Sequence, residues 1–232
     1  MTITVKPDAG YELDTVKVLD KNGDKVKVVE KNGKYTFTMP ASKVTVEATF
    51  VESKTLDNPF ADVNKDAYYF DSVLWAVENG VTSGTTATTF APNTTCTRAQ
   101  TVTFLWRAMG SPEPVMTDNP FTDVSADAYY YKAVLWAVEQ GVTFGTTATT
   151  FSPDATVTRA QTVTFLWRAA ESPKNSAENP FVDVAADAYY ADAVLWAAQQ
   201  GITSGTSATT FNPSNDCTRA QIVTFLWRAM AE

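Results

Sequence analysis

The chain has 232 residues, of which 44% are hydrophobic and 12% aromatic, so it is long enough to bury a sizeable core. Lys and Arg number 18 against 26 Asp and Glu, and the net charge of -8 argues against nucleic acid as a partner. Histidine is absent and only two cysteines are present, which excludes His-based catalysis, His-ligated zinc and a disulfide-rich scaffold. We therefore expect no metal and no cofactor.

A membrane span is not predicted, because the sequence has no run of about 18 apolar residues. Met1 is not followed by the charged and apolar regions of a signal peptide. On composition alone, the chain is either cytoplasmic or a fragment of something longer.

Residues 1–52 are predicted to form strands, because apolar and polar residues alternate along five short runs: Thr2–Lys6, Thr15–Leu19, Lys25–Val29, Tyr35–Met39 and Val44–Phe50. Asn22-Gly23 and Asn32-Gly33 separate neighbouring runs and are typical hairpin turns. The pattern predicts a small antiparallel sheet or a thin sandwich. Fifty residues is marginal for independent stability, so we expect this module to be incomplete at its N-terminus.

The rest of the chain is an internal repeat. Three segments of 52 residues align without a gap, at 58–109, 119–170 and 179–230, and 33 positions are identical in all three. The acidic charge lies here: residues 58–232 hold nine cations and 17 acids, whereas residues 1–57 hold nine of each. Six of the nine cations are arginines, at two fixed positions in each repeat.

Each repeat is predicted to form a helix, a loop and a second helix. In the first repeat Asp66 is a candidate N-cap for a helix ending near Asn79, with Gly80 as its stop, and the second helix spans Thr97–Met109. Most of the six tryptophans fall on apolar helix faces, which predicts core positions. One repeat has too small a core to stand alone, so three must share one, in a closed pseudo-threefold assembly or a short solenoid.

The repeated Thr-Arg-Ala-Gln at 97–100, 158–161 and 218–221 predicts a capping box at the start of each second helix. The box explains Thr and Gln but not the arginine, whose charge opposes the helix dipole. Two interpretations remain for this residue: an ion pair with Asp62, Asp123 or Asp183, or capture of an anion together with the free amides of the helix N-terminus.

The other repeated features have structural interpretations. The second arginine of each repeat lies in the last helical turn, where it complements the dipole (Arg107, Arg168, Arg228). The Gly-Val-Thr-Ser-Gly-Thr segment at 80–85 is either a helix stop with a tight turn or a loop that approaches a ligand. Cys96 and Cys217 align with Val157, which predicts buried free thiols.

The succession Asn-Pro-Phe-x-Asp-Val, Ala-Tyr-Tyr, Val-Leu-Trp-Ala, Thr-Phe-x-Pro, Thr-Arg-Ala-Gln and Phe-Leu-Trp-Arg-Ala resembles the S-layer homology (SLH) domain, in its usual three copies. Residues 1–52, with Lys-Pro-Asp-Ala-Gly-Tyr-Glu-Leu, resemble part of a bacterial surface β-repeat, the divergent internalin B-repeat. The resemblance implies a multidomain chain, in which a small all-β module precedes a mainly α SLH triplet. It also implies that the triplet forms a pseudo-threefold, three-pronged spindle with a helical core.

The resemblance implies non-covalent anchoring of an exported protein to the secondary cell wall polysaccharide of a Gram-positive-type wall. This polymer is anionic and commonly carries a pyruvate ketal on an amino sugar. On this view the chain is an extracellular fragment without its signal peptide, it is not an enzyme, and it neither binds nucleic acid nor inserts into a membrane. The alternative is a structural subunit that self-associates in a surface layer.

The family's binding residues map onto three sets in grooves between neighbouring repeats: arginines Arg98, Arg159 and Arg219, motif residues Gln100, Gln161 and Gln221, and glycines Gly84, Gly145 and Gly205. Gln replaces the family's Glu in all three copies, which removes an acid beside the expected anion. Phe144 stands where Ser83 and Ser204 stand in the other repeats, so we expect the groove at repeat two to be narrower or inactive.

Overall fold

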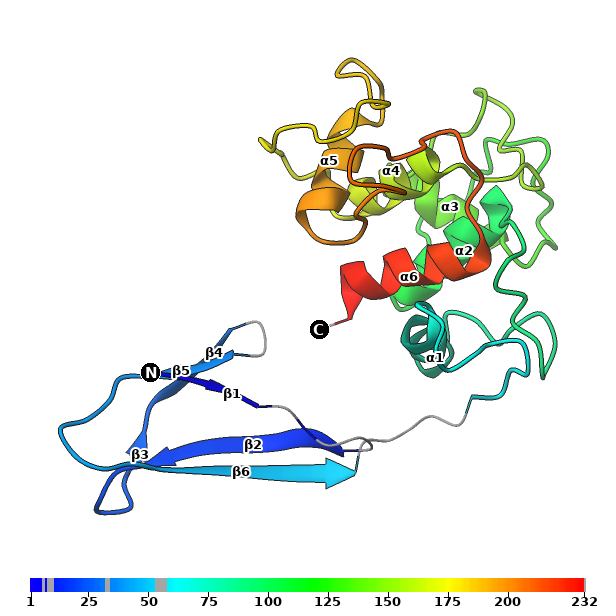
Figure 1. Cartoon of the computed structure of the whole chain (residues 1–232). Coiled ribbons are helices and arrows are strands. Elements are labelled where there is room, and N and C mark those ends of the chain that lie inside the picture. Colours follow the sequence, from blue (N-terminus) through cyan, green and yellow to red (C-terminus); the bar gives the residue numbers. More distant parts are fainter. Residues whose placement is uncertain (6, 8–10, 32–33, 53–57, 232) are drawn as a thin grey trace. The chain divides into compact units, whose positions relative to one another are not determined.

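A computed structural model of the chain describes residues 1–5, 7, 11–31, 34–52 and 58–231. The chain divides into two compact units, Met1–Asp57 and Asn58–Glu232 (Figure 1). The boundary between the two units lies between the β-module and the three repeats.

In its described residues the smaller unit is all β, with six strands in two antiparallel three-stranded sheets (Figure 1). One sheet has the order β1 (Thr2–Thr4), β5 (Lys34–Phe37), β4 (Val28–Lys31), and the other β3 (Lys25–Val26), β2 (Tyr11–Leu19), β6 (Thr45–Glu52). The run predicted at Lys25–Val29 is broken at Lys27, so its two halves join different sheets. The all-β prediction is confirmed, with one more strand than expected.

The turn at Asn22-Gly23 is confirmed: Gly23 has φ of +84° and its amide donates to the carbonyl oxygen of Asp20 at 3.0 Å. The turn predicted at Asn32-Gly33 lies outside the described residues. Among the described residues of this unit, only Val18 and Phe37 are buried hydrophobic side chains.

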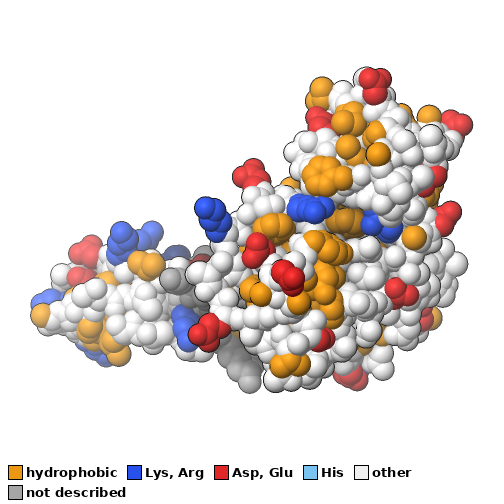
Figure 2. Space-filling model, turned by 90° about the horizontal axis from the view of Figure 1, so that it is seen from above, with side chains coloured by type: hydrophobic (Ala, Val, Ile, Leu, Met, Phe, Trp, Pro, Cys, Tyr) orange, Lys and Arg blue, Asp and Glu red, His pale blue; other side chains and the backbone are white. Residues whose placement is uncertain are grey.

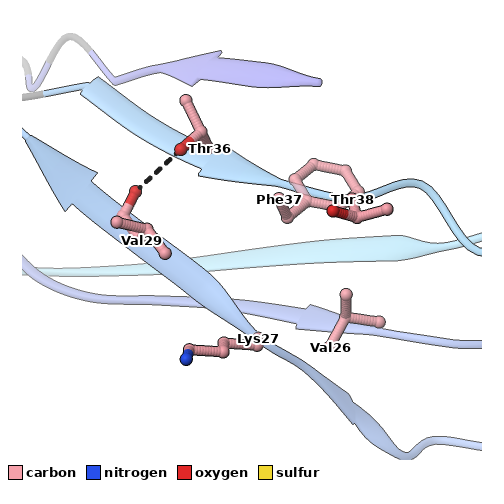
Figure 3. A pocket seen from close by; sticks show the side chains of 6 residues that line it. All are labelled: Val26, Lys27, Val29, Thr36, Phe37 and Thr38. Carbon is pink, nitrogen blue, oxygen red and sulfur yellow. Dashed lines mark hydrogen bonds between the residues drawn. The ribbon is translucent and has the colours of Figure 1, made fainter.

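A hollow of about 390 Å³ lies beside Phe37, lined by Val26, Lys27, Val29, Thr36 and Thr38 (Figure 3). Thr36 Oγ1 donates to the carbonyl oxygen of Val29 at 3.2 Å and ties β5 to β4 there. With only Val18 and Phe37 as buried hydrophobic side chains among its described residues, this unit is still expected to be marginally stable by itself.

The larger unit has two helices in each repeat: α1 (Phe70–Glu78) and α2 (Arg98–Ala108), α3 (Tyr131–Glu139) and α4 (Arg159–Ala169), α5 (Ala191–Gln199) and α6 (Arg219–Met230). The capping box is complete in all three second helices. At α2, Thr97 Oγ1 accepts from the amide of Gln100, and Gln100 Oε1 accepts from the amide of Thr97.

The first helices begin later than predicted, because Asp66 is not an N-cap. Asn64 Oδ1 accepts from the amide of Asp66, and two successive turns, Ala67 to Asn64 and Phe70 to Ala67, carry the chain to the helix. The predicted stop at Gly80 is confirmed, since Gly80 has φ of +67° and the next amide, of Val81, reaches back to Ala76 at 2.8 Å.

The helices of the three repeats pack in a closed cycle. The first helix of each repeat contacts the second helix of the repeat before it: α3 contacts α2, α5 contacts α4, and α1 contacts α6 (Figure 1). The helices α2, α4 and α6 also contact one another. Because repeat three returns to repeat one, the assembly is closed and is not a solenoid; the three-pronged spindle stays a prediction.

A ring of three backbone hydrogen bonds joins the repeats. The amide of Cys96 donates to Cys217, that of Cys217 to Val157, and that of Val157 to Cys96, at 2.9, 2.9 and 3.0 Å. All three side chains are fully buried and both thiols are free, so the prediction for the cysteines is confirmed. Burial raises the pKa of Cys96 to about 12, which keeps its thiol protonated.

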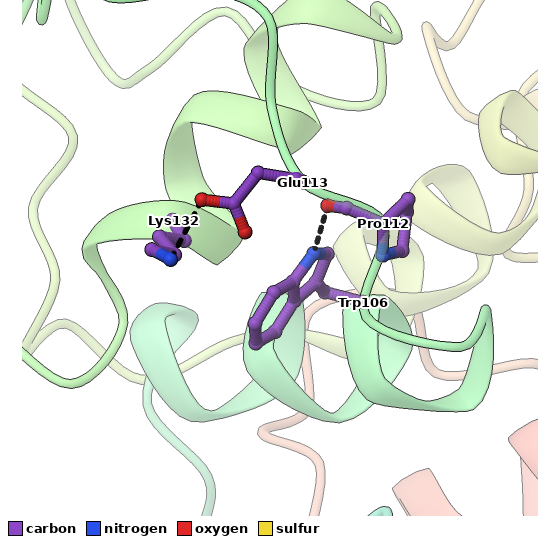
Figure 4. Close-up of polar contacts among 4 residues, drawn as sticks. All are labelled: Trp106, Pro112, Glu113 and Lys132. Carbon is purple, nitrogen blue, oxygen red and sulfur yellow. Dashed lines mark hydrogen bonds and ion pairs between the residues drawn. The ribbon is translucent and has the colours of Figure 1, made fainter.

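The two segments between the repeats, 110–118 and 171–178, are each attached to the preceding repeat by a tryptophan. Trp106 Nε1 donates to the carbonyl oxygen of Pro112 at 2.8 Å, and Glu113 then pairs with Lys132 of α3 at 2.6 Å (Figure 4). Trp167 makes the same bond to Pro173 at 3.0 Å. These two tryptophans are half-buried, and only Trp136 and Trp196 reach the buried core that was predicted for most of the six.

Candidate functional site

Arg98, the unexplained arginine of the first motif, reaches into the second repeat. Its side chain is 3% exposed, and Nε donates to the carbonyl oxygen of Phe151 at 2.9 Å. The guanidinium carbon lies 4.9 Å from the centre of the Phe151 ring and 5.5 Å from that of Phe165. Nη2 donates to Thr143 Oγ1 at 3.4 Å. A cation of one repeat is thus held among aromatic rings of the next.

The other two arginines repeat these contacts in a cycle. Arg159 donates from Nε to the carbonyl oxygen of Phe211 at 2.9 Å, with its guanidinium carbon 4.8 Å from that ring centre. Arg219 returns to the first repeat, where it donates to the carbonyl oxygen of Phe90 at 2.7 Å and lies 4.8 Å from that ring centre. Each arginine therefore connects two repeats.

The helix N-terminus cannot supply the free amides that the anion interpretation required. The amide of Arg98 donates to the carbonyl oxygen of Ala155 at 2.9 Å, and that of Ala99 to Pro153 at 3.0 Å. The amide of Gln100 is taken by Thr97. The neighbouring repeat and the capping box thus satisfy these donors, and the expectation of free amides was wrong.

The ion-pair interpretation is also wrong, since no arginine of the motif forms an ion pair with any residue described in 58–231. Asp62 instead accepts from the amides of Phe90 and Ala91 at 2.8 and 2.7 Å. Asp123 and Asp183 hold the matching amides in their repeats. These carboxylates fix the loop whose Phe carbonyl then receives the arginine, so they position it indirectly.

Within residues 58–231 the three arginines form no ion pair, although Asp123, Asp183 and Asp62 act from a longer distance to favour the charged forms of Arg98, Arg159 and Arg219, respectively. Burial lowers the pKa of Arg98, Arg159 and Arg219, although guanidinium groups remain charged at neutral pH. Arg159 is 4% exposed, and its Nη2 is buried with no hydrogen-bond partner. An unpaired buried cation is costly, and an incoming anion removes that cost.

Two hollows are lined by two of these arginines, Arg159 and Arg98, and each hollow is built by all three repeats. The first, about 350 Å³, is named the Ser204 groove and is lined by Arg159 with Tyr68, Thr203, Ser204, Gly205, Gln221 and Arg228. The second, about 220 Å³, is named the Phe144 groove and is lined by Arg98 with Thr143, Phe144, Gly145, Gln161, Arg168 and Tyr189. Figure 2 shows basic side chains beside hydrophobic ones on one face of the larger unit.

The predicted residues meet across repeats and not within a motif. Arg98 shares its groove with Gly145 and Gln161, and not with Gln100 of its own motif. In the same way, Arg159 shares a groove with Gly205 and Gln221. The Phe144 groove has the smaller volume of the two, and its being narrower or inactive as a binding site stays a prediction.

Tight packing within a repeat accounts for the groove glycines. Gly145 has φ of +84°, and a β-carbon there would lie 2.5 Å from the Phe121 ring and 2.6 Å from the carbonyl oxygen of Thr150. Gly84 and Gly205 are enclosed in the same way by Phe60 and Phe181. The tight-turn interpretation is therefore sufficient, even though Gly145 and Gly205 also line the grooves.

Sequence reasoning missed three kinds of groove residue. Arg168 and Arg228 line the grooves while also donating to the carbonyl oxygens of Val142 and Ile202, at 3.2 and 3.1 Å. Exposed tyrosines complete both grooves: Tyr68 of repeat one lines the Ser204 groove, and Tyr189 of repeat three lines the Phe144 groove. Thr143 and Thr203 are the third kind. Their only signal was recurrence at fixed positions, which a helix core also produces.

A family model of the S-layer homology domain matches residues 59–102, 120–163 and 180–223, which together are more than half of the chain. The chain belongs to the S-layer homology family. The three SLH matches coincide with the three repeats, and a model of the divergent InlB B-repeat domain matches residues 1–54. Both resemblances found in the sequence are thereby confirmed.

Proteins similar to this SLH chain are much longer than it. It is 34% identical over 187 residues to an endoglucanase of Bacillus sp. (strain KSM-635), covering 76% of this chain and 20% of that protein. It is 32% identical over 163 residues to the surface-layer 125 kDa protein of Lysinibacillus sphaericus, covering 68% and 14%. A cell surface protein of Thermoanaerobacter kivui is 33% identical over 118 residues, covering 48% and 15%.

Within the described ranges, no three or more Cys, Asp or Glu side chains are grouped as metal ligands. None of the described helices has the length and apolar character needed to cross a bilayer.

Proposed function

We propose that this chain anchors a larger exported protein to the bacterial cell wall by binding an acidic secondary cell wall polysaccharide in the grooves between SLH repeats. The observation that carries the proposal is Arg159, which lines the Ser204 groove and whose buried Nη2 has no hydrogen-bond partner. A site that holds a desolvated cation beside an accessible hollow is a receptor for an anion.

A carboxylate on a sugar fits this groove better than a free-standing ion. Arg159 supplies a planar donor, and Arg228 adds a second cation at the rim of the same groove. Tyr68, 62% exposed, supplies apolar surface beside them, and the buried ring of Phe225 lies behind the arginine, with its centre 5.4 Å from the Arg159 guanidinium carbon. A pyruvate ketal combines a carboxylate with a methyl group and a sugar ring, so it matches this mixture of charge and aromatic surface.

Affinity must come from local contacts and from repetition. The repeats carry nine cations against 17 acids, so long-range electrostatic repulsion opposes the approach of an acidic polymer. Two or more grooves that engage one polymer raise its effective concentration at the others, which compensates for weak single sites.

The relatives support an anchoring role at the cell surface for a module that occurs in otherwise different proteins. Proteins named as a surface-layer protein, a cell surface protein and an endoglucanase share this region while differing in the rest of their length. We therefore assign attachment, and not catalysis, to the chain itself; the activity of any larger parent is a separate matter.

Sedimentation with purified cell wall tests the proposal. We expect the chain to sediment with intact wall and to stay in solution with wall stripped of its polysaccharide. Arg159→Gln should weaken sedimentation, whereas Lys174→Gln should not, because exposed Lys174 lies outside both grooves and loses the same charge.

Equal sedimentation with stripped wall would refute the proposal, as would equal behaviour of the two variants when both are folded. Concentration-dependent assembly without polysaccharide would instead support the alternative, a self-associating surface-layer subunit.

A further inference from the structure

The two grooves differ most at one position, where Phe144 replaces Ser204. Phe144 is 66% exposed, and its ring lies 5.3 Å from the guanidinium carbon of Arg168. Arg168 is half-buried, whereas its counterpart Arg228 is exposed. The Phe144 groove has a volume of about 220 Å³, against about 350 Å³ for the Ser204 groove.

The cations of the two grooves are also partnered differently. In the Phe144 groove, Arg98 Nη2 donates to Thr143 Oγ1 at 3.4 Å, and Arg168 is occupied by the aromatic ring. In the Ser204 groove, Arg159 Nη2 has no hydrogen-bond partner, although Thr203, the counterpart of Thr143, lines the same groove. This difference is small, because a contact of 3.4 Å is a weak hydrogen bond. The larger difference is at the rim, where Arg228 of the Ser204 groove is exposed and Arg168 of the Phe144 groove lies against an aromatic ring.

An exposed aromatic ring at a groove mouth offers a different kind of contact. The C–H groups on one face of a pyranose ring form an apolar surface that stacks on an aromatic ring. Phe144 keeps two thirds of its surface open even though Arg168 lies against its ring. Tyr189, 63% exposed, lines the same groove and offers a second ring.

We propose that the grooves are specialised: the Ser204 groove binds the acidic substituent of the polysaccharide, and the Phe144 groove binds a neutral sugar ring stacked on Phe144. This inference rests on the proposed polysaccharide binding. Phe144 then determines specificity by converting an anion site into a stacking site, and one polymer chain satisfies both grooves only if it carries both kinds of unit.

Titration with two monosaccharide probes tests the division. The probes are the methyl glycoside of N-acetylmannosamine and its 4,6-pyruvate ketal, and the backbone amide signals of Gly145 and Gly205 report on the two grooves by NMR. We expect the neutral probe to shift the Gly145 signal, and the ketal to shift the Gly205 signal at lower concentration.

Variants at one exposed position isolate the aromatic ring. Phe144→Leu should lower the affinity for the neutral probe, measured at Gly145, about fivefold, because the apolar volume remains but the ring is lost. Phe144→Ser should lower this affinity equally and should also give the groove affinity for the ketal. The control Val182→Ser removes an apolar side chain that is 83% exposed outside both grooves, and should change neither titration.

Two results would overturn the specialisation alone: ketal binding of equal strength at both grooves, or neutral-probe binding at Gly145 that is unchanged in Phe144→Leu. If neither probe shifts either signal in the unmodified chain, the proposed function fails as well, so the two failures are distinguishable.

Discussion

A pair of glycine substitutions separates packing from backbone strain. Gly145 and Gly110 have nearly the same φ, +84° and +85°, but a β-carbon at Gly145 would lie 2.5 Å from the Phe121 ring, while at Gly110 it meets nothing within 4 Å. For Gly110→Ala, the cost is only that of an alanine with a left-handed backbone, which lowers the free energy of unfolding by about 1 kcal/mol. Alanine at Gly145 adds about 1–3 kcal/mol of overpacking, so we expect about 2–4 kcal/mol in all.

Tryptophan fluorescence during urea or thermal unfolding measures the difference, because all six tryptophans lie in the repeats. We expect Gly145→Ala to lower the melting temperature by roughly 5–15 °C and Gly110→Ala by a few degrees. Equal effects would refute the packing explanation. If Gly145→Ala left stability unchanged but abolished binding, the glycine would instead be required by ligand approach.

Three further outcomes follow from the same contacts. Cys96→Val should change the free energy of unfolding by less than about 1 kcal/mol, since Val157 fills the equivalent site, and native Cys96 should resist iodoacetamide until the protein unfolds. Burial opposes ionisation of Asp183, but amide hydrogen bonds such as that from Phe211 outweigh it, so its pKa is lowered on folding. The stability it contributes is therefore present above its unfolded pKa and lost as pH falls through the folded one, and unfolding titrations between pH 5 and 2 should be flatter for Asp183→Asn. A chain ending at Ala170 lacks the partners of two remaining helices, so circular dichroism should show no cooperative unfolding of the repeats.

Sequence patterns predicted what depends on neighbours along the chain. The capping box at Thr97 and the stop at Gly80 were correct because their hydrogen bonds join residues within five positions of each other. The start of α1 was misplaced because Asp66 lies within a turn, in which its amide donates to Asn64 Oδ1, and so does not cap a helix. Lys27 gave no sign of dividing a strand, since alternation continues across it.

The site depended on contacts that no local pattern encodes. Arg98 was recognised as unexplained, but its partners, Phe151 and Thr143, lie more than 40 residues away in another repeat. The motif alone offered an ion pair or an anion as the partner of Arg98, and neither interpretation predicts that Arg98 is only 3% exposed. Its burial means that alanine would leave the carbonyl of Phe151 without its donor, so charge-removing variants need Gln and a folding control.

The hydrogen-bond ring at Cys96, Val157 and Cys217 has a consequence for gene duplication. Each repeat contributes one donor and one acceptor, and three repeats use them all. Each first helix is likewise already matched to a second helix of another repeat. A fourth tandem copy would find no open edge to join, unlike a copy added to a solenoid. Longer arrays of this module should therefore grow by whole triplets, and duplication of a single repeat would yield an orphan segment exposed to proteolysis.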